Sequence, residues 1–235
     1  MKATHLTPCD EITLLENCYE FIIPKYREAH DMMVAMLDFA PNHELRIADL
    51  GCGFADLSLR ILQHFPIASV FGIDRNDLIL QRARSKFVAQ DMNFVPFQHD
   101  LNSNTWTDGL VPLDAVVSSF TLDYLPLPRH QDILVEAIQA LNPGGRWISC
   151  EFFEAEDNRI NRVFHDLEMQ YIRTALQDGQ LDHDQVEQLG NSSILRQPHY
   201  LCTVDTKVNW LREAGYRSVS VPWRFLNLAV ISATK

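Results

Sequence analysis

The chain has 235 residues, of which 46% are hydrophobic and 22% are charged, a composition typical of a globular protein with a buried core. Its formal net charge of -11 disfavours a polyanionic partner such as nucleic acid, because phosphate binding ordinarily requires a basic patch. No stretch is long and apolar enough to span a membrane, and the first residues have no apolar signal core. The five cysteines are scattered without metal-ligand spacing. We therefore expect free thiols, no metal and a cytoplasmic location.

The first elements that the sequence predicts are two helices, over residues 10–23 and 26–39, separated by Pro24. A buried strand follows over 46–50, and Gly51 and Gly53 then lead directly into an amphipathic helix over 57–65. Glycines permit a sharp turn and the close approach of a ligand, and the N–H groups at a helix start favour polar or anionic groups. This strand, turn and helix predict a nucleotide-like cofactor.

The second predicted strand, residues 69–73, leads to Asp74, which lies 23 residues after Gly51. That offset is close to the roughly 20 residues at which an acid binds ribose hydroxyls in dinucleotide-binding folds. Arg75 follows, as would suit the 2′-phosphate of NADP. However, Asp56 occupies the third glycine position of the dinucleotide fingerprint, where its charge would repel a pyrophosphate. The sequence thus favours a ligand without phosphates, and an NAD-dependent oxidoreductase is a lesser alternative.

Further strands are predicted near 93–97, 113–118 and 145–151, each separated from the last by a helical segment. This alternation predicts an α/β fold with a doubly wound, largely parallel sheet. Ligands of such sheets bind at the carboxyl ends of the strands. The residues at or just past those ends, which we expect around one crevice, are Gly51, Asp74, Asp100, Ser118 and Glu151.

The alternation stops after the fifth strand. A long helix is predicted over 160–176, followed by a polar acidic segment over 178–191.

Several segments resemble motifs of class I S-adenosylmethionine-dependent methyltransferases. Asp49-x-Gly51-x-Gly53-x-Ala55 is similar to motif I, with alanine at the usual third glycine. Four later stretches follow in the family's order, namely Gly72-Ile-Asp74, Gln98-His-Asp100-Leu101, Leu113 to Leu125, and Leu141-Asn-Pro-Gly-Gly. The C-terminal residues 210–216 and 219–233 resemble the family's last helix and closing hairpin. The resemblance implies a Rossmann-like sheet of seven strands, mostly parallel with an antiparallel C-terminal hairpin strand, and a helical lid. We therefore expect four segments: an N-terminal helical lid (1–40), a cofactor-binding core (41–151), a helical insertion or substrate lid (152–205), and the last helix and closing hairpin of the core (206–235). The resemblance further implies S-adenosylmethionine as methyl donor and S-adenosylhomocysteine as product.

The resemblance also implies roles for cofactor-binding residues. Gly51 and Gly53 permit close approach, Cys52 is a small apolar neighbour, and Asp49 orients the loop or meets the methionine ammonium through water. Asp74, beside Arg75, binds the ribose hydroxyls. Asp100 and Leu101 bind the adenine, while Ser118 and Phe120 line the reaction crevice.

The N-terminal Phe21-Ile-Ile-Pro-Lys-Tyr26 narrows the resemblance to the branch that contains carboxy-S-adenosylmethionine synthase and related small-molecule methyltransferases. In that branch this segment folds over the cofactor, which adds Tyr26 and Tyr19 to the expected cofactor-binding residues. Candidates for a general base, of which none is singled out, are His30, Asp123, Tyr124, His165 and His199.

The leading interpretation is methyl transfer to a small molecule, by a monomer or a homodimer without a nucleic-acid or membrane partner. Synthesis of carboxy-S-adenosylmethionine from the cofactor and prephenate, for tRNA wobble-uridine modification, is an alternative. It would need an additional cation for a carboxylate, for which Arg162 and Arg196 are candidates. Methylation of tRNA or protein and a non-catalytic, cofactor-binding regulatory role are further alternatives.

Overall fold

A computed structural model describes residues 7–88, 90–110 and 112–235. The chain forms two compact units. The helical unit comprises the described part of residues 1–27 together with Ala155–Pro198, and the sheet unit comprises Glu28–Glu154 and His199–Lys235. Residues 1–6 of the predicted N-terminal lid lie outside the described residues, and the predicted lid roles stay predictions.

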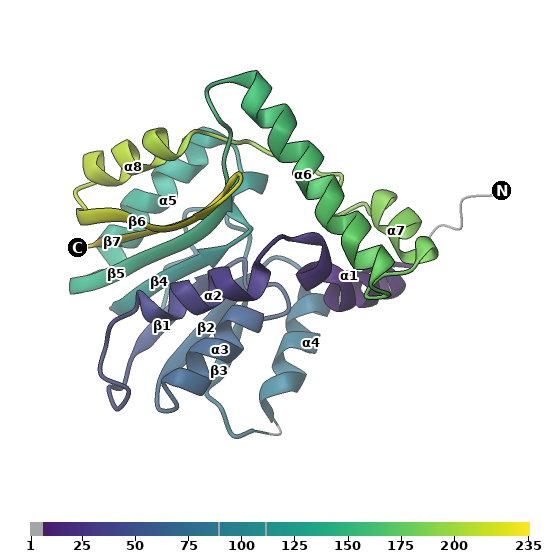
Figure 1. The fold of residues 1–235 in the computed structure, drawn as a ribbon. Coiled ribbons are helices and arrows are strands. Elements are labelled where there is room, and N and C mark those ends of the chain that lie inside the picture. Colours follow the sequence, from purple (N-terminus) through teal and green to yellow (C-terminus); the bar gives the residue numbers. More distant parts are fainter. Residues whose placement is uncertain (1–6, 89, 111) are drawn as a thin grey trace. The chain divides into compact units, whose positions relative to one another are not determined.

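The sheet unit contains one seven-stranded sheet (Figure 1). Its strands are β1 (Arg46–Leu50), β2 (Ser69–Asp74), β3 (Phe94–Gln98), β4 (Leu113–Ser119), β5 (Leu141–Phe152), β6 (Arg217–Phe225) and β7 (Leu228–Thr234), in the order β3-β2-β1-β4-β5-β7-β6. β1 to β5 pair in parallel, and β7 runs antiparallel to both β5 and β6. The predicted Rossmann-like α/β fold is confirmed, and the chain order reverses between β1 and β4, where such sheets bind their ligands.

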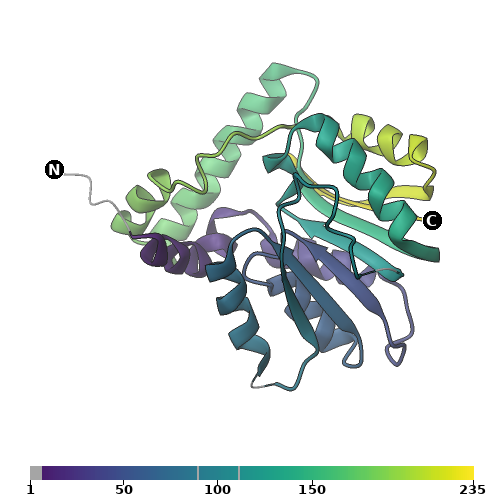
Figure 2. The ribbon, with the colours of Figure 1, turned by 180° about the vertical axis from the view of Figure 1, so that it is seen from behind.

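Helices cover both faces of this sheet. They are α2 (Tyr26–Ala35), α3 (Asp56–His64), α4 (Asp77–Val88), α5 (Leu127–Ala140) and α8 (Val204–Glu213), with a short 3-10 helix η1 (Leu122–Tyr124) before α5. Met33, Leu62 and Ala83 of α2, α3 and α4 share one core, and Leu134 and Leu211 of α5 and α8 share the other. In Figure 1 α2 and α3 lie in front of the sheet, and in the reverse view of Figure 2 α5 does. Because both faces are covered, most residues of the central strands β1 and β4 are buried.

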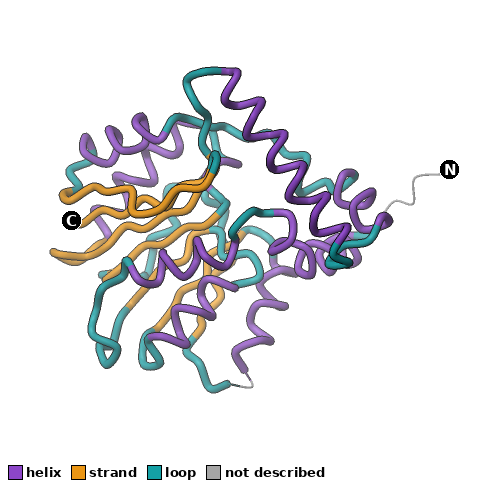
Figure 3. Tube along the Cα trace, in the orientation of Figure 1, coloured by secondary structure: helices purple, strands orange, loops and turns teal. Residues whose placement is uncertain are grey.

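The helical unit consists of α1 (Pro8–Ile22), α6 (Asn158–Gln177) and α7 (His183–Gly190), joined by loops (Figure 3). The Glu11 carboxylate of α1 accepts hydrogen bonds from the Ser192 and Ser193 hydroxyls and the Ile194 N–H, at 2.7–3.1 Å. These bonds fasten the segment after α7 to α1. Nowhere in the described ranges does a helix have the length and apolarity needed to cross a membrane.

Four elements differ most from the sequence prediction. The last helix, expected over 210–216, is α8, which begins at Val204 and ends at Glu213. α2 ends at Ala35 rather than near residue 39, and Asp38 beyond it has a positive φ of 47°. β5 begins at Leu141 because the Leu-Asn-Pro-Gly-Gly segment already pairs with β4, with an irregular register between Leu113 and Ala115. α7 occupies a segment predicted only as polar, and its start is fixed by a capping box in which Asp182 and Gln185 bind each other's backbone N–H groups.

Candidate functional site

The glycine turn after β1 packs against the chain that leaves β4. Gly51 has φ +65°, and a Cβ placed there would lie 2.0 Å from Cγ2 of Thr121. The Thr121 hydroxyl donates a 3.0 Å hydrogen bond to the Gly51 carbonyl. Gly53 also has a positive φ, of +51°, but the nearest atom to its added Cβ would be the Gly51 carbonyl oxygen at 4.0 Å. Gly51 is therefore required for internal packing, whereas Gly53 faces open space.

Asp74, at the end of β2, is tied to this turn. Its Oδ2 accepts a hydrogen bond from the Gly53 N–H at 3.1 Å, and its Oδ1 accepts one from the Asn76 N–H at 2.9 Å. Burial raises the pKa of this carboxyl, and the two backbone N–H groups partly offset that effect. The predicted ribose acceptor thus lies directly beside the glycine turn.

Asp49 is buried beneath the same turn, with 1% of its surface exposed. The Ser58 hydroxyl donates to its Oδ2 at 2.6 Å, and its Oδ1 has no hydrogen-bond partner within the described ranges. Burial raises the pKa of Asp49 to about 7. A buried carboxylate oxygen without a donor is costly, so the site has an acceptor that a ligand or a water molecule would satisfy.

Asp100 and Leu101 differ in their surroundings. Asp100 is exposed, and its Oδ1 accepts hydrogen bonds from the Asn102 backbone at 2.9 Å and side chain at 3.0 Å, which lower its pKa. The Leu101 side chain belongs to the core beneath α5, and its carbonyl accepts a hydrogen bond from Arg129 at 2.6 Å. The adenine-binding role of Asp100 and Leu101 stays a prediction.

Ser118 and Phe120, which were predicted to line the reaction crevice, also differ from each other in burial. Ser118 is fully buried and its hydroxyl donates to the Leu50 carbonyl at 3.0 Å, so it joins β4 to β1. Phe120 has φ +52°, and its ring lies 5.8 Å from the rings of both His30 and Phe152. Of the two, Phe120 is the half-buried side chain at the end of the strand.

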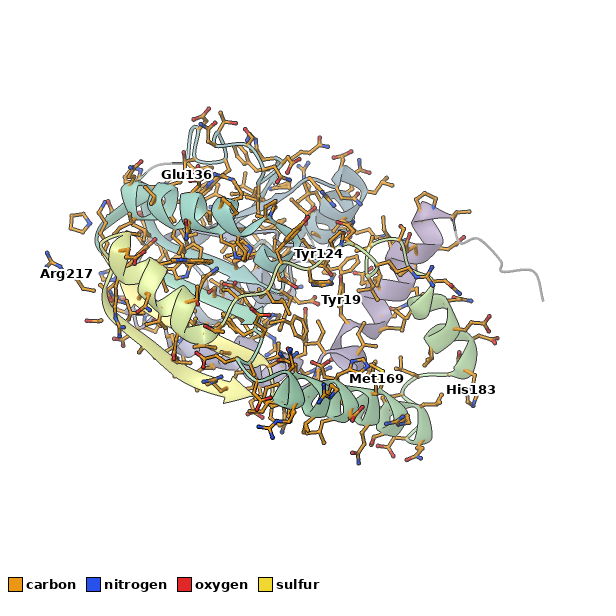
Figure 4. All side chains as sticks on the ribbon, turned by 90° about the horizontal axis from the view of Figure 1, so that it is seen from above. Tyr19, Tyr124, Glu136, Met169, His183 and Arg217 are labelled. Carbon is orange, nitrogen blue, oxygen red and sulfur yellow. The ribbon has the colours of Figure 1, made fainter. Side chains whose placement is uncertain are left out.

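Three of the five base candidates meet just beyond β4. Nδ1 of His199 lies 2.5 Å from Oδ2 of Asp123, although 76 residues separate them, and the Tyr200 N–H donates to the Asp123 carbonyl at 2.6 Å. The Tyr124 ring, labelled in Figure 4, lies 4.5 Å from the His199 ring. Asp123 is 2% exposed, and its Oδ1 has no hydrogen-bond partner among the residues described. Since two residues span at most about 7 Å, Asp123 also lies near Thr121 and the glycine turn.

The other candidates have different surroundings. His30 on α2 is 1% exposed, and burial lowers its pKa to about 3, which keeps the ring neutral. His165 is exposed on α6, and Tyr19 and Tyr26 also belong to the helical unit.

Two further residues lie at the glycine turn and β2. Arg75 is exposed next to Asp74. Cys52 is half-buried, and burial raises its thiol pKa well above the ordinary value, so the thiol stays protonated as expected for a small apolar neighbour.

Comparison with known proteins relates part of the sheet unit to a family of enzymes. A family described as a methyltransferase domain matches residues 47–145, which include the glycine turn, Asp74 and Asp123. This part of the sheet unit is therefore similar to known methyltransferase domains. Within the described residues, no group of three or more His, Cys, Asp or Glu side chains is arranged to hold a metal ion.

Similar proteins match most of the chain. A carboxy-S-adenosyl-L-methionine synthase of Campylobacter lari is 23% identical over 214 residues, covering 91% of this chain and 87% of the relative. An O-methyltransferase family protein of Burkholderia thailandensis has a TM-score of 0.64 at 14% identity, over 92% of this chain but only 58% of that protein. Magnesium protoporphyrin IX methyltransferase of Synechocystis PCC 6803, solved with S-adenosylhomocysteine, has a TM-score of 0.58 at 16% identity, over 99% and 89%. At these identities the structural likeness concerns the fold.

Two features of the sheet unit were missed by the sequence analysis. Thr121 lies inside the segment assigned to the fourth strand and its loop, and nothing local marks it as a partner of Gly51. Lys207 of α8 is fully buried and donates to Oε2 of Glu151 at 2.9 Å. This pair had a signal, because Lys207 shares a helical face with Val204, Val208 and Leu211, where a charge needs a buried partner.

Proposed function

We propose that this chain transfers a methyl group from S-adenosylmethionine to a small-molecule acceptor, with His199 as the general base. The observation that carries the proposal is the hydrogen-bonded pair of Asp123 and His199. Asp123 follows Thr121 by two residues, and Thr121 packs against Gly51 of the glycine turn. A histidine oriented by a buried carboxylate is a common arrangement for proton transfer near neutral pH.

The residues at the turn fit the cofactor. Asp74 offers a carboxylate to ribose hydroxyls, the unpartnered Oδ1 of Asp49 suits the methionine ammonium directly or through water, and Gly53 leaves space beside the backbone. Asp56 holds the first position of α3 and pairs with Lys86 at 3.0 Å, which places an acid where a pyrophosphate would otherwise bind. This donor and acceptor set supports a ligand without phosphates.

When bound, S-adenosylmethionine supplies a methyl group on a sulfonium, which moves to the acceptor atom while the C–S electron pair stays on sulfur as S-adenosylhomocysteine. The residues of the chain supply the proton transfer. With the Nδ1 proton held by Asp123, Nε2 of His199 accepts the proton of the acceptor. The Asp123 carboxylate then stabilises the imidazolium, since an opposite charge at hydrogen-bond distance favours the protonated ring.

Calorimetry with S-adenosylmethionine, S-adenosylhomocysteine and NADH tests the cofactor. We expect binding of the two adenosyl ligands, and binding of NADH alone would overturn the proposal. Asp74→Ala should weaken S-adenosylmethionine binding by about 1.5–3 kcal/mol, or roughly 10- to 150-fold in Kd. Asp77→Ala is the matched control, because Asp77 is an exposed aspartate three residues further along. Equal affinity of the folded Asp74 variant and wild type would remove Asp74 from the site.

The base is tested by release of S-adenosylhomocysteine with a panel of small alcohols, phenols and amines. With any acceptor that turns over, His199→Gln should lower the rate by about 10²–10⁴-fold while the Kd of S-adenosylmethionine stays unchanged. Asp123→Asn should lower the rate in the same direction. Full activity of the His199 variant would refute its role as base.

The curated relatives favour a second candidate, a carboxy-S-adenosylmethionine synthase-like reaction. Its product carries a carboxylate, for which Arg162 and Arg196 of the helical unit were the candidate cations. Arg196 donates to the Gly190 carbonyl and to Oδ1 of Asn191, both at 2.8 Å, and Arg162 is exposed on α6. Mass spectrometry after incubation with S-adenosylmethionine and prephenate tests this candidate, since only this reaction forms the carboxylated sulfonium.

A further inference from the structure

The carboxyl edge of the sheet is acidic at every one of its first five strands. One acid lies at the end of each strand or within four residues beyond it: Asp49, Asp74, Asp100, Asp123 and Glu151. Lys207 neutralises Glu151, and the positive charge of the exposed Arg75 favours the ionised forms of Asp74 and Asp100. At Asp123 the partner is a histidine, which carries a positive charge only when protonated.

Three of these carboxylates are almost completely buried and incompletely hydrogen-bonded. Asp49, Asp123 and Glu151 are at most 2% exposed, and each has one oxygen without a hydrogen-bond partner in the described part of the chain. Such an oxygen is satisfied by a hydrogen-bond donor, whereas a carboxylate brought against it would leave two acceptors facing each other. The bound molecules best suited to this edge therefore bring N–H, O–H or positive charge.

The surrounding charge has the same sign. Residues 28–154 and 199–235 contain 13 lysines and arginines against 19 aspartates and glutamates. Residues 1–27 and 155–198 contain 7 against 12. Each unit is negative by itself, so the net charge of the sheet unit has the same sign as the strand-end acids that it contains and adds to their repulsion of an anion.

We propose that the acceptor is a neutral or cationic molecule whose accepting atom carries a proton, and that the site discriminates against carboxylates. This rests on the proposed function, in which Asp123 and His199 stand beside the transferred methyl group. The proton on the accepting atom follows from the proposed base, because a general base is needed only when the acceptor carries a proton at working pH. The exclusion of carboxylates follows from the acids at the strand ends.

Carboxy-S-adenosylmethionine tests the proposal without a known acceptor, because it carries a carboxylate on the carbon that is otherwise transferred. Its Kd for the full chain is compared by calorimetry with those of S-adenosylmethionine and of sinefungin, which has an ammonium near that position. We expect the two cationic ligands to bind at least about tenfold more tightly than the carboxylated one. Binding of the carboxylated ligand as tightly as S-adenosylmethionine would overturn the inference.

A charge-neutralising variant adds a second, independent readout. Asp123→Asn keeps the shape of the side chain and should reduce the discrimination against the carboxylated ligand at least threefold. The matched control is Asp77→Asn, which removes one negative charge from an exposed position and should leave the ratio unchanged. An equal effect of the two substitutions would contradict the role of the strand-end acids. If none of the three ligands binds wild type, the proposed function itself fails, whereas tight binding of the carboxylated ligand refutes only the inference.

Discussion

The two glycines of the turn provide a direct test of the site, because the structure assigns them different roles. Gly51→Ala places a methyl group 2.0–2.7 Å from three atoms of Thr121, and it imposes φ +65° on an alanine. The backbone conformation costs about 1–2 kcal/mol and the overlap about 1–3 kcal/mol. We therefore expect Gly51→Ala to lower the free energy of unfolding by roughly 2–5 kcal/mol.

Gly53→Ala should carry the energetic cost of a positive φ but no steric overlap, since its Cβ would have no neighbour nearer than 4.0 Å. The loss of stability should be about 1–2 kcal/mol. If the cofactor lies beside Gly53, the added methyl group meets it and weakens binding about tenfold or more, from an overlap of roughly 1–3 kcal/mol. Gly51→Ala should thus mainly reduce stability, whereas Gly53→Ala should mainly reduce cofactor binding.

Urea unfolding and calorimetric titration with S-adenosylmethionine measure the two effects. Gly109→Ala is the control, because Gly109 also has a positive φ, of +77°, with no atom within 4 Å of an added Cβ. It should share the backbone cost and leave binding unchanged. In Gly51→Ala/Thr121→Gly the overlap is removed, so part of the stability should return. Wild-type affinity in Gly53→Ala, or equal stability of the Gly51 and Gly53 variants, would refute the reasoning.

Three further predictions follow from buried ionisable groups. Burial raises the pKa of Asp49 to about 7, against about 3.9 in an unfolded chain. Its contribution to the free energy of unfolding is therefore lost as the pH rises between these two values, so from pH 5 to pH 8 Asp49→Asn should become roughly 3 kcal/mol more stable relative to wild type. Urea unfolding of the cofactor-free protein measures this difference, and no gain for the variant would contradict the raised pKa. Lys207→Met leaves Glu151 buried without its partner and should cost about 3–5 kcal/mol, whereas Lys207→Met/Glu151→Leu should recover most of it; the same thermal or urea curves decide, and a double variant as unstable as the single one would rule out an unpaired charge as the cause. The Cys52 thiol, whose pKa burial raises, should stay unalkylated by iodoacetamide at pH 8 while the exposed Cys9 reacts, as peptide mass spectrometry would show; equal labelling would mean that Cys52 is not shielded.

The sequence alone determined the parts of the site that are contiguous in the chain. β1, the glycine turn and α3 form one run of residues, and each has a local signature: a buried apolar strand, two glycines at positive φ, and an amphipathic helix. Asp74 was found for the same reason, because a parallel strand that is buried on both faces has a sharp apolar boundary at its carboxyl end. The seven strands with an antiparallel C-terminal hairpin strand were expected from the family resemblance, and the strand order itself comes from the structure.

Only the tertiary structure decided which distant side chains meet. Asp123 and His199 are 76 residues apart, Thr121 and Gly51 are 70 apart, and Lys207 and Glu151 are 56 apart. Their contacts depend on where an irregular segment returns to the sheet, and no periodic pattern encodes that return. The sequence therefore could not rank the five candidates for the base, whereas the fold places Asp123 at hydrogen-bond distance from His199. A side chain acquires its chemical role from neighbours within a few ångströms, and in this chain those neighbours are supplied by the packing of the whole sheet unit rather than by the adjacent sequence.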